Sequence, residues 1–163
     1  MVLADAELID WLNDQKDVGG FNDFGLPRER TPRDALMRGP LRNEYNGTLI
    51  IERLTGEPVG TVQWRAVHYG PPDRSRAWNI GIEIVPAARG QGLGAEAQHL
   101  LAEWLFVATD VNRVEAQTDI ENIPEQRSLA KAGFTREGVN RGSQFRAGAF
   151  HDLVMYSRLR SDS

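Results

Sequence analysis

The sequence contains no cysteine. It can therefore form no disulfide, no thiolate metal site and no cysteine nucleophile. Its three histidines, at positions 68, 99 and 151, show no metal-ligand spacing, so we expect no bound metal. No apolar run approaches the roughly 18 residues that span a bilayer, and the N-terminus lacks the basic-then-apolar pattern of a signal peptide. These absences predict a cytoplasmic protein that does not interact with a membrane.

An excess of basic residues is also lacking. The chain has 19 lysines and arginines against 23 aspartates and glutamates, for a net charge of −4. A domain devoted to nucleic acid is usually basic, so we expect no nucleic-acid partner. With 163 residues, 40% of them hydrophobic, the chain has the size and composition of one globular domain spanning 1–163.

Hydrophobic periodicity and turn residues predict a mixed α/β fold. Tryptophans 64, 78 and 104 lie in strand or helix patterns and are expected in the core. A hairpin followed by a β-α-β-α-β-β order is not a regular βαβ alternation. The expected elements are helix 4–16, helix 31–39, a hairpin over 47–67, strand 77–86, helix 95–109, strand 113–119, helix 124–133 and two strands within 134–159.

The stretch ARGQGLGAEA, residues 88–97, places three glycines between a strand pattern and a helix pattern. The first amides of a helix have no partner within it and carry partial positive charge. Gly90, Gly92 and Gly94 would let the backbone approach a phosphate closely. Arg89 adds a guanidinium suited to phosphate oxygens. The loop therefore predicts an anion site, against the alternative of a plain strand-to-helix turn.

Two other phosphate motifs fit this loop less well. No Gly-Lys-Ser/Thr follows, which argues against a P-loop. Gly90-x-Gly92-x-x-Ala95, with Glu115 downstream, matches the loose dinucleotide fingerprint. That fingerprint usually opens a parallel βαβαβ unit, whereas a hairpin precedes the glycines here.

Two separated motifs resemble the GNAT acetyltransferases. IVPAARGQGLG is similar to their acetyl-coenzyme A loop, and TDIENIPEQRSLAKAGFTREG is similar to their second signature, with Asn122, Lys131, Gly133 and Phe134 on the matching positions. HDLVMYS resembles the closing strand of the RimJ/RimL-like branch. The resemblance covers about residues 45–160. It implies a mostly antiparallel twisted sheet flanked by helices, with the first strand missing or shortened, and an exposed sheet edge of that kind favours a homodimer.

The resemblance implies an N-acetyltransferase that moves the acetyl group of acetyl-coenzyme A directly to a primary amine, without an acyl-enzyme. The central strand would splay from its neighbour, and an amide near Ile84 would polarise the thioester carbonyl. The alternative is an acyl-coenzyme A binding module without turnover. The residues expected to bind the cofactor are Ile84, Val85, Arg89, Gly90, Gln91, Gly92, Leu93, Gly94, Ala95 and Asn122.

The sequence offers several candidates for the residues that move protons. Where the family often has Ser, three positions after the asparagine, this chain has Glu125, which fits a helix-capping pattern. Ser128, one turn later, is the candidate acid. His68 and Glu83 are the candidate bases, beside an ordered water. The branch's usual acidic residue before Ile-Gly is replaced by Asn79.

The acceptor side is expected to include an early apolar loop and two further positions. Its amine would be either a protein N-terminal α-amine, which the RimJ/RimL resemblance implies, or a small molecule. The residues expected to contact it are Phe21, Asp23, Phe24, Tyr69 and Asp152.

Overall fold

We analysed a computed structural model of the chain, which describes residues 8, 14, 21, 24 and 43–162. The predicted helices 4–16 and 31–39 lie largely outside the described residues, as does Asp23. The expectation of a missing first strand falls on the same part of the chain.

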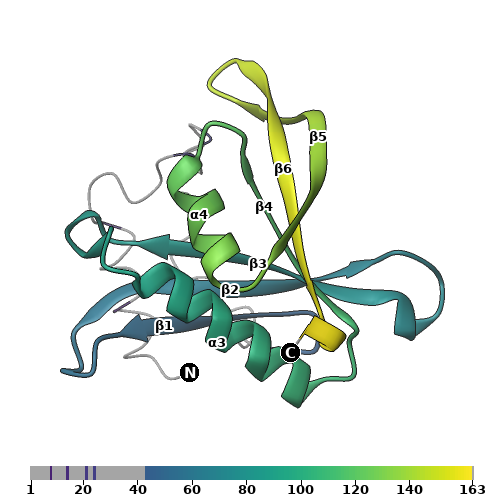
Figure 1. Ribbon diagram of the computed structural model, residues 1–163, viewed down its shortest axis with the longest axis horizontal. Coiled ribbons are helices and arrows are strands. Elements are labelled where there is room, and N and C mark those ends of the chain that lie inside the picture. Colours follow the sequence, from purple (N-terminus) through teal and green to yellow (C-terminus); the bar gives the residue numbers. More distant parts are fainter. Residues whose placement is uncertain (1–7, 9–13, 15–20, 22–23, 25–42, 163) are drawn as a thin grey trace.

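Within the described part of the chain, six strands form one sheet in the order β1-β2-β3-β4-β6-β5. Neighbouring strands are antiparallel except β3 and β4, which are parallel (Figure 1). This mixed, mostly antiparallel sheet is the fold class that the sequence predicted. The strands are β1 (Asn46–Glu52), β2 (Pro58–His68), β3 (Arg76–Ile84), β4 (Arg113–Asp119), β5 (Thr135–Arg146) and β6 (Ala149–Leu159).

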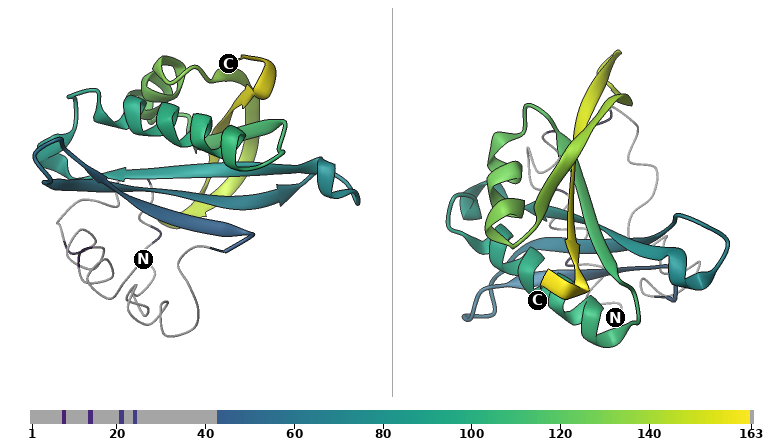
Figure 2. Two further views of the ribbon diagram at one scale, coloured as in Figure 1. Left: turned by 90° about the horizontal axis from the view of Figure 1, so that it is seen from below. Right: turned by 45° about the vertical axis from the view of Figure 1, so that its right-hand side comes forward.

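Two helices, α3 (Leu93–Ala108) and α4 (Ile123–Lys131), cover one face of the sheet (Figure 2, left). The buried side chains of α3 recur at helical spacing and face β2 and β3. They are Gln98, Leu101, Ala102, Leu105 and Phe106. Gln98 is the one polar member of that stripe, and it becomes important at the functional site.

The core lies between these helices and the sheet. Trp64 and Trp78 are 4% and 3% exposed, and Trp104 of α3 packs edge-on against Trp64 with ring centroids 5.2 Å apart. The expectation that these tryptophans belong to the core is confirmed. Burial of such large apolar side chains is the main force that holds α3 on the sheet.

The two halves of the sheet diverge at β3 and β4. Their pairing is limited to Trp78–Ile80 on β3 and Val114–Ala116 on β4. Beyond that point β3 continues to Ile84 and β4 to Asp119 without pairing with each other, and Figure 1 shows β4, β6 and β5 running steeply away from β1–β3. The predicted splay of the central strand is therefore present, and it leaves a gap between two strand ends.

The element boundaries agree closely with the sequence pattern. The hairpin over 47–67 and the strand at 113–119 are confirmed, and the other predicted bounds within residues 43–162 differ by a few residues. The last two strands are joined only by Ala147 and Gly148, both with positive φ, which is a tight hairpin turn. In the described ranges, no helix combines the length and apolar character needed to cross a bilayer.

Candidate active-site cleft

A cleft of about 490 Å³ opens where β3 ends, between the glycine loop and α4. We call it the glycine-loop cleft. Its volume is that of an ordinary small-molecule site. The predicted site residues that line it are Phe21, Glu83, Ile84, Arg89, Gly90, Gly92, Leu93, Gly94, Ala95, Asn122 and Ser128. The lining residues outside that prediction are Ile82, Ala88, Pro124, Glu125, Arg127 and Lys131.

The N-terminus of α3 faces this cleft. Gly92 is the N-cap of α3, with φ of 84°, and no side chain caps the helix there. Gly90 also has a positive φ of 74°, and a Cβ on either glycine would meet nothing within 4 Å. Both glycines are thus required by backbone conformation and not by crowding. The uncapped amides at this helix start carry partial positive charge, which is the property on which the predicted anion site depends.

Gly94 has a different role from the other two glycines. A Cβ at Gly94 would lie 3.2 Å from the Ser128 hydroxyl oxygen and 3.7 Å from Ile82. The absence of a side chain at Gly94 therefore lets the first turn of α3 approach α4 closely. This contact brings the glycine loop and Ser128 to opposite walls of one cleft.

The edge of β3 that faces the gap carries backbone groups that are not paired with β4. The amide of Val85 donates to the Val59 carbonyl at 2.9 Å, on the β2 side. Because backbone groups alternate along a strand, the amides of Ile82 and Ile84 point to the other side, into the gap. Arg89 Nε donates to the Ile84 carbonyl at 2.9 Å, so this arginine also ties the loop to the strand end.

The beginning of α4 forms the opposite wall of the cleft. Asn122 is its N-cap, since the side-chain oxygen accepts the Glu125 amide at 3.3 Å. Its amide group donates to the Thr118 hydroxyl at 3.0 Å. The capping interpretation of Asn122 is confirmed, and the residue lines the cleft as well. The Glu125 carboxylate, however, does not complete a capping box, because it turns toward α3.

Glu125 joins a polar group that links the two helices. Its carboxylate accepts a hydrogen bond from Gln98 Nε2. The Ser128 hydroxyl donates to Gln98 Oε1 at 3.1 Å, and Gln98 itself is 1% exposed. One buried amide thus holds two of the polar residues of α4 that line the cleft, Glu125 and Ser128.

Burial dominates the electrostatics of Glu125. It raises the pKa of this carboxyl to about 7, and the hydrogen bond from Gln98 offsets only part of that effect. A carboxyl group with such a pKa exchanges protons near neutrality. The sequence pattern favoured a capping role for Glu125. The signal that would have revealed it is Gln98, a polar residue in the first position of a buried apolar stripe.

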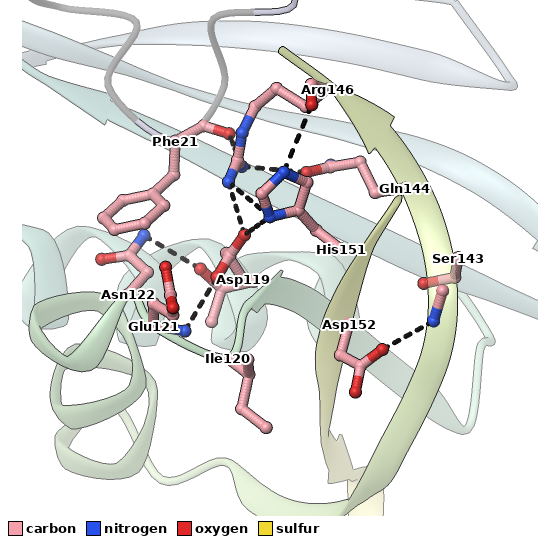
Figure 3. A network of polar contacts seen from close by, with 12 residues as sticks. Phe21, Asp119, Ile120, Glu121, Asn122, Ser143, Gln144, Arg146, His151 and Asp152 are labelled. Atoms are coloured by element: carbon pink, nitrogen blue, oxygen red, sulfur yellow. Dashed lines mark hydrogen bonds and ion pairs between the residues drawn. The ribbon is translucent and has the colours of Figure 1, made fainter. Parts of the chain in front are cut away.

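A second polar network lies beside the cleft, where β4 ends (Figure 3). Arg146 of β5 donates to Asp119 at 2.6 Å and to the Phe21 carbonyl, and its guanidinium lies 5.4 Å from the centre of the Phe21 ring. His151 Nδ1 lies 3.4 Å from the same Asp119 oxygen. Phe21, which lines the cleft, is therefore held by the β5–β6 hairpin.

His68 and Tyr69 lie outside the cleft, which corrects their predicted positions. His68 pairs with Arg76 at the start of β3, whereas the cleft lies at Ile84. At ~3.3 Å per residue, the ends of this nine-residue strand are about 26 Å apart. Tyr69 donates to the buried Glu115 at 2.5 Å. The sequence showed that both residues precede a loop, but not that this loop points away from the glycines.

The other predicted residues outside the cleft either form hydrogen bonds with backbone groups or are exposed to solvent. Asp152 accepts the amide of Gly142 at 2.7 Å, which favours the alternative that it ties a turn. Gln91 donates to the Ala87 carbonyl at 3.0 Å and so supports the loop from behind. Val85 is bonded to β2, and Phe24 is 43% exposed.

A sheet with this splay, a glycine loop at a helix N-terminus and a cleft at the exposed strand edge define a class of acyl-coenzyme A binding folds. The family model described as the acetyltransferase (GNAT) domain matches residues 1–135. The chain therefore belongs to the GNAT acetyltransferase domain family.

Among individual proteins, the chain is similar to the uncharacterized N-acetyltransferase p20 of Bacillus licheniformis. The two are 29% identical over 122 residues, which are 75% of this chain and 66% of p20. The chain thus spans just under two thirds of that relative's length. The sequence relatives do not single out the RimJ/RimL-like branch.

Solved structures share the fold at low sequence identity. Spermidine N-acetyltransferase from Vibrio cholerae, in complex with CoA and spermine, superposes with a TM-score of 0.81 at 18% identity, covering 99% of this chain and 94% of that one. RimJ of Mycobacterium smegmatis, in complex with CoA-disulfide, superposes with a TM-score of 0.78 at 21% identity, covering 99% of this chain and 80% of that one. These likenesses concern the arrangement of the backbone.

Proposed function

We propose that this protein is an acetyl-coenzyme A dependent N-acetyltransferase acting on a primary amine. The observation that carries the proposal is the junction of three features in one cleft. The uncapped start of α3 at Gly92, the outward-facing edge of β3 at Ile82 and Ile84, and the polar start of α4 all line it. Membership of the GNAT family supports the same activity.

The chain's own groups fit the parts of acetyl-coenzyme A. The amides of residues 92–95, with the helix dipole, suit its pyrophosphate. The gap-facing edge of β3 can pair with the amide-containing pantetheine arm as an added strand would. Arg127 and Lys131, exposed on α4 at the same cleft, add positive charge for the remaining phosphate.

The chemistry needs positioning and two proton movements. The amide of Ile84 or Ile82 polarises the thioester carbonyl as the amine attacks it. The carbon–nitrogen bond forms, the carbon–sulfur bond breaks, and the thiolate leaves. The chain offers no cysteine for an acyl-enzyme, which agrees with the direct transfer to the amine that the GNAT resemblance implies. Glu83, at the cleft, and an ordered water are the remaining candidate bases.

The acceptor is either a protein N-terminal α-amine or a small amine. One structural neighbour is a RimL that acetylates the α-amine of ribosomal L7/L12, and another is a spermidine acetyltransferase. In this chain the acceptor would approach from the side of Phe21 and the Asp119–Arg146 network. A panel of peptides, polyamines, amino acids and aminoglycosides, read by mass spectrometry, tests the activity and identifies the acceptor class.

A binding module without turnover is the second candidate function. The replacement of the branch's acidic residue by Asn79 favours it, because Asn79 supplies no base. Acetyl-coenzyme A binding by calorimetry, together with an absence of thiol release across the whole amine panel, would establish the module. Thiol release that depends on an amine would instead establish the transferase.

We also propose that the protein acts in the cytoplasm and that it forms a homodimer. Both ends of the described sheet, β1 and β5, are edge strands, and open edges tend to be covered or paired. Light scattering at micromolar concentration tests this. A single species near 18.2 kDa would contradict it.

A further inference from the structure

Glu125 is an unusual residue for the wall of an anion-binding cleft. It lies in the first turn of α4, the helix that follows β4 in the chain, and it lines the cleft together with the end of β3. Glu125 is partly buried, and within residues 43–162 its carboxylate accepts a hydrogen bond from the neutral amide of Gln98 and pairs with no cation. A buried carboxylate without a cationic partner is costly when it is ionised. Such an arrangement is typical of a group kept protonated for chemistry.

Gln98 fixes the orientation of that carboxyl. It is 1% exposed, and its oxygen is occupied by the Ser128 hydroxyl. The amide group of Gln98 must therefore face Glu125. Because the Ser128 hydrogen is already donated to Gln98, Ser128 is a poor proton donor toward the cleft. The sequence-based choice of Ser128 as the acid is thus less favoured than Glu125 by the hydrogen-bond directions.

We infer that Glu125 is the acid that protonates the departing coenzyme A thiolate, and that Gln98 is its positioning residue. This inference rests on the proposed transferase function. As the carbon–sulfur bond breaks, the carboxylic acid of Glu125 gives its proton to the sulfur and becomes a carboxylate. The nitrogen that has formed the amide releases a proton to water or to Glu83, and Glu125 regains its proton from solvent.

Other charged groups of the cleft come from each surrounding element. Glu83 lies on β3, Arg89 on the loop, and Arg127 and Lys131 on α4. The causes that set the pKa of Glu125 are its burial and the Gln98 hydrogen bond. Burial thus keeps this carboxyl available as an acid up to near-neutral pH.

The first test compares Glu125→Gln with the wild type over a range of pH. We expect kcat to fall at least about 100-fold in the variant, the usual contribution of a positioned acid. In the wild type kcat should decline as pH rises through a value near 7, because the acid form is lost, and this decline should be absent in Glu125→Gln. Glu121→Gln is the control, since it removes an exposed carboxylate at the same helix start. An unchanged decline in Glu125→Gln would overturn the inference.

The second test distinguishes a positioning role of Gln98 from a purely structural one. Gln98→Met keeps the side-chain volume but removes the hydrogen bond that lowers the pKa of Glu125. The decline of kcat should therefore move to higher pH, while acetyl-coenzyme A affinity stays within a few-fold of the wild type. A lower kcat without any displacement of the pH profile would show that Gln98 acts only structurally.

The third test does not need turnover. Carbon-13 NMR of the glutamate carboxyls, assigned with Glu125→Gln, follows the titration of Glu125 in the presence of coenzyme A or desulfo-coenzyme A. We expect the titration midpoint to differ between the two ligands, because only one has a sulfur to contact. Equal midpoints would overturn the inference even if acetylation occurs. If the midpoints differ but no amine is acetylated, the proposed function fails and the contact between Glu125 and the thiol stands.

Discussion

Arg146 Nη2 lies 2.6 Å from Asp119 Oδ2, and the two side chains are 9% and 1% exposed. The pair joins the end of β5 to the end of β4, beside the gap that β3 and β4 leave between them. Through its second nitrogen and its contact with the Phe21 ring, Arg146 also holds a residue of the cleft wall. Arg146 therefore both anchors the β5–β6 hairpin to β4 and positions Phe21 in the wall of the glycine-loop cleft.

Arg146→Met should destabilise the protein by about 3–5 kcal/mol at neutral pH, because it leaves the Asp119 carboxylate buried without its cation. Burial alone would raise the pKa of Asp119, but the amide of Glu121 and the Arg146 guanidinium outweigh it, and the pKa is lowered. The pair's contribution is thus present above the ordinary pKa of an aspartate and is lost as pH falls through the lowered value.

Urea denaturation measures this effect at neutral and at acidic pH. The difference between Arg146→Met and the wild type should shrink in acid. Arg136→Met, at an exposed position of the same strand, is the control and should cost little. A stability difference that does not change with pH would contradict a charge-based role for the pair.

Gly92→Ala should separate backbone strain from ligand binding. The left-handed φ costs an alanine roughly 1–2 kcal/mol, without a steric clash, because nothing lies within 4 Å of the new Cβ. Gly56, in the β1–β2 turn, has the same φ of 84° and the same empty surroundings. Both alanine variants should lose similar stability, but only Gly92→Ala should weaken acetyl-coenzyme A binding in calorimetry.

Gly92→Asp tests the same loop by adding a negative charge. A carboxylate at the start of α3 would stand where we place the pyrophosphate, so binding should be abolished. If Gly92→Asp binds acetyl-coenzyme A as tightly as the wild type does, the loop is not the phosphate site.

Glu125→Gln should stabilise the folded protein at alkaline pH. The pKa of Glu125 is raised from 4.5 to about 7, so its stabilising contribution is complete below pH 4.5 and is lost as pH rises through about 7. One pKa unit corresponds to about 1.4 kcal/mol, so the gain above neutrality should be about 1–3 kcal/mol. Urea denaturation at about pH 5 and about pH 8 should give a larger gain at the higher pH. A gain that is equal at both would show that burial does not perturb this carboxyl.

His68→Ala should leave acetyl transfer almost unchanged. The residue is exposed and lies at the opposite end of β3 from the cleft, so it reaches neither the thioester nor the amine. We expect kcat and its pH profile to match the wild type within about twofold, since surface changes away from the site act weakly. Loss of the rising limb of the profile in this variant would restore His68 as the base.

Local patterns in the sequence were sufficient to predict most of the described fold. The β-rich composition of GTLIIE predicted a strand. Alternation in AWNIGIEI predicted another strand, and the stretch around Leu101 and Leu105 predicted the long helix, because these periods reflect burial of one face. The glycine loop could be found in the same way, since a strand, spaced glycines and a helix start are adjacent along the chain. Asn122 could be recognised as a cap for the same reason.

Contacts between distant segments could not be predicted in this way. His68 and Glu83 are both strand residues near polar sequence, and only the antiparallel register of β2 and β3 shows that His68 lies at the end of β3 away from the cleft. Glu125 resembled a capping residue until packing placed Gln98 of α3 against it. Arg146 and Asp119 come close because β4 and β5 both pair with β6, which places the ends of these two strands on the same part of the sheet. The sequence determined the elements and the glycine loop, because the physics of both is local. Tertiary packing decided which carboxyl is buried at the cleft, because burial and the pKa that follows from it depend on neighbours far away in the chain.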